Sequence, residues 1–171
     1  MLRPPRVRRG HVAAWIGVGG YGLGPRETDE WLQAGISVRP GQAPALYYEV
    51  ALPNREPRFV MLHGHFPIGR AVRVAVLESS RRANWWEVWV NGTIVARQIH
   101  LPQGHGAWRP VATAESWSDI GSACNAFAFR FDNVVTPSAP RGSWRPLAGS
   151  ILEDPGYRLV RRGSTLVARS S

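Results

Sequence analysis

The sequence has one cysteine, no lysine and no long apolar run among its 171 residues. The single cysteine, Cys124, excludes a disulfide framework within the chain and a structural zinc site built from several cysteines. No basic residue beside Cys124 would activate its thiol, so we expect a buried, inert side chain. No apolar stretch approaches the roughly 18 residues of a membrane span, which excludes a helix of that kind.

Several motifs of common enzyme classes are also missing. The chain contains no G-x-S-x-G, H-E-x-x-H or P-loop pattern. The glycines of Gly17–Gly24 follow a strand pattern but precede no helical one, so we expect a tight turn there rather than a phosphate cradle. His63 and His65 could lie on one strand face, but no third ligand joins them at a suitable spacing. We therefore expect no metal and no cofactor.

The charge is strongly positive, because 21 arginines face 12 acidic residues and give a formal net charge of +9. A basic set made only of arginine is as easily explained by a GC-rich genome as by a chosen chemistry. The sequence therefore predicts neither nucleic acid nor a membrane as a partner, although an anion-binding role remains a third alternative that salt dependence would test. Many arginines lie near the two chain ends: Arg3, Arg6, Arg8, Arg9, Arg158, Arg161, Arg162 and Arg169.

The first ten residues resemble a signal peptide only in their charge. The apolar stretch that follows, 12–18, is short, and no small-residue cleavage site comes after it. We interpret residues 1–10 as a solvated basic tail and residues 11–171 as a single domain.

Apolar and polar residues alternate with a period of two along most of the chain, and glycine and proline clusters interrupt the pattern. A short helical turn is expected only within 116–124. Many short strands separated by turns indicate an all-β protein, a two-sheet antiparallel β-sandwich. The predicted strands are 12–18, 31–38, 45–52, 71–78, 85–90, 93–101, 126–132 and 157–168.

The clearest local prediction is a hairpin between 85–90 and 93–101. Asn91 and Gly92 supply the two positive-φ residues of a type I′ turn. Asn91-Gly92-Thr93 also matches a glycosylation sequon, but the turn already explains these residues.

Several predicted strands have one aliphatic face and one face that mixes aromatic and polar side chains. In 31–38, the residues Trp31 and Gln33 oppose Leu32 and Ala34. Such a sheet forms a wet groove that suits an extended polymer. Gln33 is unusual in it, because glutamine is disfavoured in a buried strand, and Glu115 is the second polar residue that stands out.

Six short motifs follow one another in the order found in a known family. They are Ala14-Trp15-Ile16-Gly17, Leu32-Gln33-Ala34-Gly35, Tyr47-Tyr48-Glu49, Asn91-Gly92-Thr93, Thr113-Ala114-Glu115 and Phe129–Val134. On these motifs the chain resembles the eqolisins, the glutamic peptidases, in a bacterial form, over residues 12–168. The resemblance implies a concanavalin A-like, jelly-roll β-sandwich with a concave substrate groove.

The resemblance also implies that Gln33 and Glu115 are the catalytic pair of an acid-acting endopeptidase. Glu115 would take a proton from the attacking water, and Gln33 would donate a hydrogen bond to the developing oxyanion. No metal, cofactor or covalent intermediate is implied. Substrate-binding residues would be Trp15, Trp31, Tyr47, Glu49 and Trp117, with Glu49 beside Gln33. By the same resemblance the protein is a secreted monomer that acts on polypeptides.

Three positions depart from the family pattern. Gly19 stands where members commonly have aspartate, Tyr47 replaces a tryptophan, and Ser116 stands where tryptophan follows the catalytic glutamate. The last change moves the aromatic to Trp117, which then faces the other way or needs a bulge. The alternative function is a non-catalytic module that binds an extended glycan or peptide through Trp15, Trp31, Trp85, Trp89 and Tyr47.

Overall fold

The protein is all-β, as the alternation predicts. The structure, a computed structural model, describes residues 1, 4–62, 66, 68–103, 105–118, 125–139 and 142–170. Within these residues the chain forms antiparallel β-strands and one short 3-10 helix, η1 (Pro25–Glu27). In the same part of the chain, no helix has the length and hydrophobicity needed to cross a membrane.

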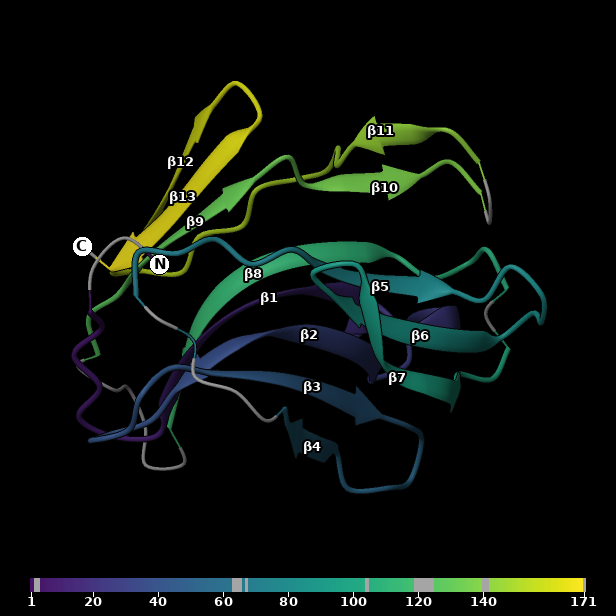
Figure 1. Cartoon of the computed structure of the whole chain (residues 1–171), viewed down its shortest axis with the longest axis horizontal. Coiled ribbons are helices and arrows are strands. Elements are labelled where there is room, and N and C mark those ends of the chain that lie inside the picture. The colour runs from purple at the N-terminus through teal and green to yellow at the C-terminus, as the bar shows by residue number, and fades with distance from the viewer. Residues whose placement is uncertain are drawn as a thin grey trace.

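One layer is a five-stranded antiparallel sheet with the strand order β4-β3-β2-β1-β8. The first four strands of the chain form a meander, in which each strand pairs with the next one. The later strand β8 pairs with the other edge of β1 (Figure 1). The strands are β1 (His11–Gly20), β2 (Glu30–Val38), β3 (Ala45–Ala51), β4 (Arg58–Met61) and β8 (Pro110–Trp117).

Two three-stranded sheets form the second layer, with the orders β5-β6-β7 and β12-β13-β9, and β10 pairs with β11 as a separate hairpin. Their bounds are β5 (Val74–Glu78), β6 (Trp85–Val90), β7 (Thr93–His100), β9 (Ala128–Asp132), β10 (Val135–Pro137), β11 (Trp144–Pro146), β12 (Tyr157–Arg162) and β13 (Thr165–Ser170).

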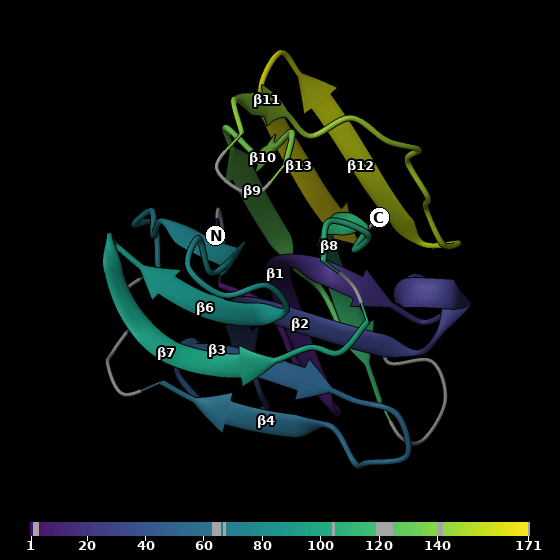
Figure 2. The same cartoon turned by 90° about the vertical axis from the view of Figure 1, so that its right-hand side faces the viewer.

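The core lies between the two layers, on the aliphatic face of the five-stranded sheet. Leu32 and Ala34 of β2 pack in one cluster with Trp86 and Val88 of β6. A second cluster joins Val12 and other residues of β1 and β2 to Phe127 and Phe129. The five-stranded sheet is thus covered on one face by two smaller sheets, an arrangement consistent with a β-sandwich (Figures 1 and 2). Burial of these side chains provides the main stabilisation of the fold.

The predicted hairpin turn is confirmed, because Asn91 and Gly92 have φ values of 50° and 83° between β6 and β7. The prediction of one strand over 157–168 is wrong. The chain reverses at Gly163, which has a φ of 58°, so the segment forms the two strands β12 and β13. The strands β4, β8, β10 and β11 are additional to those predicted.

The predicted helical turn within 116–124 is not found in the residues that the structure describes there. Ser116 and Trp117 end β8, paired with β1, and 119–124, which include Cys124, lie outside the described residues.

The described end of the basic tail is fixed to the domain through its backbone. The backbone N–H of Arg6 donates to the carbonyl of Ala126 at 2.8 Å, and the amide side chain of Asn125 bonds to the backbone of Arg8 and Arg9. The arginine side chains of this segment are exposed. The backbone of residues 6–9 is therefore part of the folded domain, whereas the charges face solvent.

Candidate functional site

The residues singled out in the sequence share one face of the five-stranded sheet, which we call the polar face. The register pairs Trp15 with Gly35 and Thr113, and Gly35 in turn with Tyr47. Because side chains alternate along a strand, every odd-numbered residue of β1, β2, β3 and β8 points to this same side. The polar face therefore carries all seven predicted site residues: Trp15, Trp31, Gln33, Tyr47, Glu49, Glu115 and Trp117.

Gln33 lies in the middle of the polar face with its amide nitrogen bound on two sides. Its Nε2 donates to the hydroxyl of Tyr47 at 3.2 Å and to Oε2 of Glu49 at 3.4 Å. The contact between Gln33 and Glu49 that the resemblance implies is therefore present. Gly17 lies opposite Gln33 on β1, and a Cβ there would meet Cβ of Gln33 at 3.1 Å. These contacts hold a side chain that is only 6% exposed in one orientation.

Glu49 connects Gln33 to Trp31, whose indole Nε1 donates to its Oε1 at 3.3 Å. Burial raises the pKa of Glu49, the hydrogen bond from Trp31 opposes the shift, and the negative charge of Glu115 reinforces it. Burial and the charges of Glu115 and Glu49 also raise the pKa of Tyr47, which keeps its hydroxyl protonated. Glu115 is thus close enough to act electrostatically on both partners of Gln33.

The raised pKa of Glu49 predicts a pH dependence of stability. The folded state binds the Glu49 proton more tightly than the unfolded chain, whose carboxyl titrates at about 4.5. Glu49 therefore contributes stability below that value, and this contribution is lost as pH rises through the higher pKa of the folded state. We expect the melting temperature of wild type to fall more steeply than that of Glu49→Gln above pH 4.5. Thermal unfolding of both proteins from pH 4 to 8 measures this, and equal slopes would contradict it.

Glu115 lies two strands away from Gln33, on β8, in contact with His11, which belongs to none of the sequence motifs. Nε2 of His11 lies 3.5 Å from its Oε1, with 25% and 36% of the two side chains exposed. The His11 ring stacks on Trp117, with centroids 5.5 Å apart and planes at 25°. His11 therefore restricts where the Glu115 carboxylate can lie. The alternation of side chains along a strand predicts that His11 lies on the polar face, because it is four residues before Trp15 on the same strand.

Two of the departures from the family pattern have structural explanations. The pairing of β8 with β1 is continuous through Glu115, Ser116 and Trp117, so no bulge occurs and Trp117 lies on the polar face beside Glu115. Gly19 has a φ of 79°, and a Cβ on it would lie 2.0 Å from the carbonyl oxygen of Glu30. Aspartate is therefore excluded at position 19 by the backbone of this chain.

The tryptophans considered for a ligand-binding groove do not gather on one surface. Trp15 and Trp31 lie on the polar face, whereas Trp85 and Trp89 belong to β6 in the other layer. Trp85 instead packs against His100, with the ring planes tilted by 32°, and the guanidinium carbon of Arg82 lies 3.9 Å from the Trp85 ring centre. A single ligand site that uses all these tryptophans together with Tyr47 is therefore not formed.

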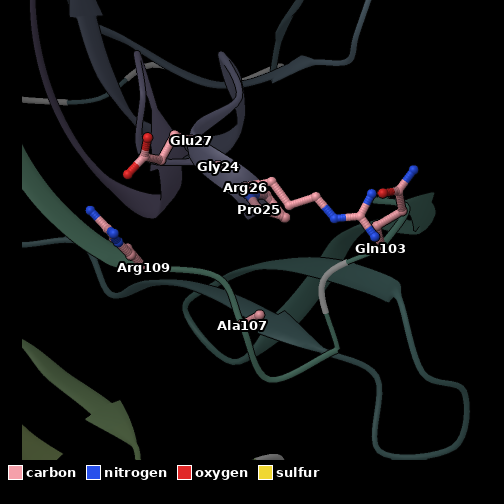
Figure 3. Close-up of a pocket in the computed structure, with 7 residues that line it drawn as sticks. All are labelled: Gly24, Pro25, Arg26, Glu27, Gln103, Ala107 and Arg109. Atoms are coloured by element: carbon pink, nitrogen blue, oxygen red, sulfur yellow. The ribbon is translucent and has the colours of Figure 1, made fainter.

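Two cavities of about 660 Å³ each adjoin the β1–β2 connection. Figure 3 shows the first, where the side chain of Arg26 extends toward Gln103 while Glu27 and Arg109 lie at the other end. The second is lined partly by Trp31 and by the segment 51–57. Neither lining includes Gln33 or Glu115, so the predicted pair is not enclosed in either cavity.

Metal-ligating side chains do not cluster in the described part of the chain. No group of three or more histidine, cysteine, aspartate or glutamate residues there could hold a metal ion. His63 and His65 lie outside the described residues, so the interpretation of that pair stays a prediction.

Comparison of the chain with protein-family models, with curated proteins and with solved structures finds no match.

Proposed function

We propose that the protein is an endopeptidase in which Glu115 and Gln33 activate a water molecule to hydrolyse a peptide bond. One observation carries the proposal: the polar face presents a carboxylate and a fixed carboxamide, flanked by Trp15, Trp31 and Trp117, on one side of one sheet. An extended polypeptide lying on such a face would expose its carbonyl groups to both residues. The resemblance to the eqolisins assigns the same two residues independently of the geometry.

The first step would use Glu115 as a general base. Its carboxylate takes a proton from water while the water oxygen bonds to the carbonyl carbon, and the carbonyl electron pair moves onto oxygen. His11 holds the carboxylate from the side. Because Glu115 is partly exposed, both water and a substrate can reach it.

Gln33 would stabilise the oxyanion that forms in this step. Of its two Nε2–H groups, the one that donates to Glu49 makes the longer hydrogen bond, at 3.4 Å, and is the one that a substrate oxygen would accept in place of Glu49. A prepositioned donor of this kind contributes roughly 2.7–4 kcal/mol in the transition state. The intermediate then collapses as the C–N bond breaks, and Glu115 returns its proton to the leaving nitrogen.

Trp117 would bind a substrate side chain next to the cleaved bond, because it lies two residues from Glu115 on the same face and is 55% exposed. Trp117→Ala is expected to lower kcat/KM for peptides with large apolar residues by roughly tenfold, the loss of one aromatic contact. Trp144 on β11 is also 55% exposed and lies off the polar face, so Trp144→Ala is the matched control. Equal losses in the two variants would remove Trp117 from substrate binding.

The direct test is digestion of a denatured protein by the purified chain between pH 2 and 9. Pepstatin is present to inhibit contaminating aspartic peptidases, and new N-termini are identified by mass spectrometry. We expect cleavage that decreases as pH rises past neutrality. A folded protein that produces no new N-termini at any pH overturns the proposal and leaves the alternative, a module that binds an extended glycan or peptide without cleaving it.

A further inference from the structure

A second surface of the protein is strongly basic and lies on a different sheet. Three arginines point to the outer side of the sheet β12-β13-β9: Arg158 and Arg162 of β12 and Arg169 of β13. They alternate along their strands with residues that face the core, such as Tyr157 and Ala168. All three are exposed, and Arg130 of β9 shares their side. We call this surface the arginine face. The sequence showed only an excess of arginine near the chain end, whereas the register shows which arginines lie together.

The arginine face is not neutralised within the protein. Arg158 lies directly opposite Arg169 in the antiparallel pair, and like charges in that position are destabilising. Among the described residues, none of Arg158, Arg162 and Arg169 has a carboxylate within 4.0 Å. Asp132, the acidic residue on this side, is bound to Arg130 at 2.9 Å. An anion placed between the two opposed arginines would relieve their repulsion.

The spacing and composition of the arginine face favour a duplex backbone over other anions. Arg158 and Arg162 are four residues apart on one strand, a distance of about 13 Å, over which duplex DNA presents several phosphates. No aromatic side chain lies on this side among the described residues, so stacking on single-stranded bases has no platform. The apolar side chains there are small, Val160, Val167 and Ala128, which does not suit insertion into a membrane.

We propose that the arginine face binds the phosphate backbone of double-stranded nucleic acid without reading its sequence. Guanidinium groups pair with phosphate oxygens through two parallel hydrogen bonds, which makes arginine well suited to this contact. The hairpin of β12 and β13 projects from the five-stranded sheet in both views, so a long duplex can approach it (Figures 1 and 2). This surface is separate from the polar face and does not depend on the proposed peptidase activity.

The test compares two triple variants that remove the same charge. R158Q/R162Q/R169Q removes three charges of the arginine face, and R55Q/R70Q/R81Q removes three exposed arginines elsewhere. Each variant lowers the formal net charge of +9 by three. Binding of a fluorescent 20-base-pair duplex of mixed sequence is measured by anisotropy from 50 to 200 mM salt. Circular dichroism checks that both variants are folded.

We expect R158Q/R162Q/R169Q to bind at least about tenfold more weakly at 50 mM salt than wild type. The slope of log affinity against log salt should fall by about 2.7 because roughly 0.9 is lost per phosphate contact. The control variant R55Q/R70Q/R81Q should keep nearly the wild-type affinity and nearly the wild-type salt slope. Equal losses in the two variants would assign the binding to net charge alone and overturn the proposal. Binding of wild type to phosphatidylserine vesicles but not to the duplex would also overturn it.

Discussion

Replacing Glu115 by glutamine is expected to reduce the rate of peptide hydrolysis by at least about 10²-fold and by as much as 10⁴-fold. General acid–base catalysis by one positioned side chain accounts for a factor of that size. Glutamine has nearly the same shape and can still contact His11, but it cannot take a proton from water. The loss should therefore fall on kcat, while the affinity for a peptide, measured with the inactive variant by calorimetry, stays close to KM of wild type.

The matched control for this substitution is Glu87→Gln. Glu87 is also a half-buried glutamate in the middle of a strand, but it lies on β6 in the other layer. It should retain wild-type activity and stability. Retained hydrolysis in Glu115→Gln would show that another group is the base and would remove the central residue from the proposed mechanism.

The second large effect concerns Gly19, where the family pattern has aspartate. Gly19→Asp is expected to destabilise the protein by more than about 3 kcal/mol, a large part of the roughly 5–15 kcal/mol that stabilises a typical domain. The new Cβ would lie 2.0 Å from the carbonyl oxygen of Glu30, in a strand that cannot move without breaking the pairing of β1 with β2. Denaturant unfolding measures the change in the free energy of unfolding.

Gly22→Asp separates the close contact from the backbone conformation. Gly22 also has a positive φ, 63°, but a Cβ there would meet no atom within 4 Å. This control should lose only about 1 kcal/mol, the usual penalty for a side chain in that conformation. Equal losses in the two variants would show that conformation alone, and not the contact with Glu30, excludes aspartate from position 19.

Most of the fold follows from hydrophobic alternation, but the strand that carries Glu115 does not. In β8 the residues on the aliphatic side are Ala112, Ala114 and Ser116, which are small and have low strand propensity. These residues differ little in hydrophobicity from those on the polar face of β8, so the local sequence lacks a clear alternation with a period of two. The strand forms because β1 offers a full row of hydrogen-bonding partners from His11 to Val18. Pairing of this kind is not visible in the local sequence.

The candidate site was predictable in its residue types but not in its detailed contacts. Alternation predicts that Trp31 and Gln33 share one face of their strand and that Tyr47 and Glu49 share one face of theirs. The register between β2 and β3 then places these two faces on the same side of the sheet. The pair formed by His11 and Trp117 depends on which residues of β1 and β8 lie opposite each other. That register is set across the whole chain by packing on the core, because a slip of one residue would turn every side chain to the wrong face.

The late position of β8 in the chain also affects how the protein folds. The strands β1 to β4 can pair through local hairpins, whereas β8 pairs His11 with Trp117, about a hundred residues later. Closing so long a loop has a higher entropic penalty than closing a hairpin, and contacts between distant residues slow folding. Gln33, Tyr47 and Glu49 can thus assemble early, and Glu115 arrives only with the later pairing of β8. The polar face is therefore complete only once β8 has paired with β1, and a chain that lacks this pairing presents Gln33 without Glu115.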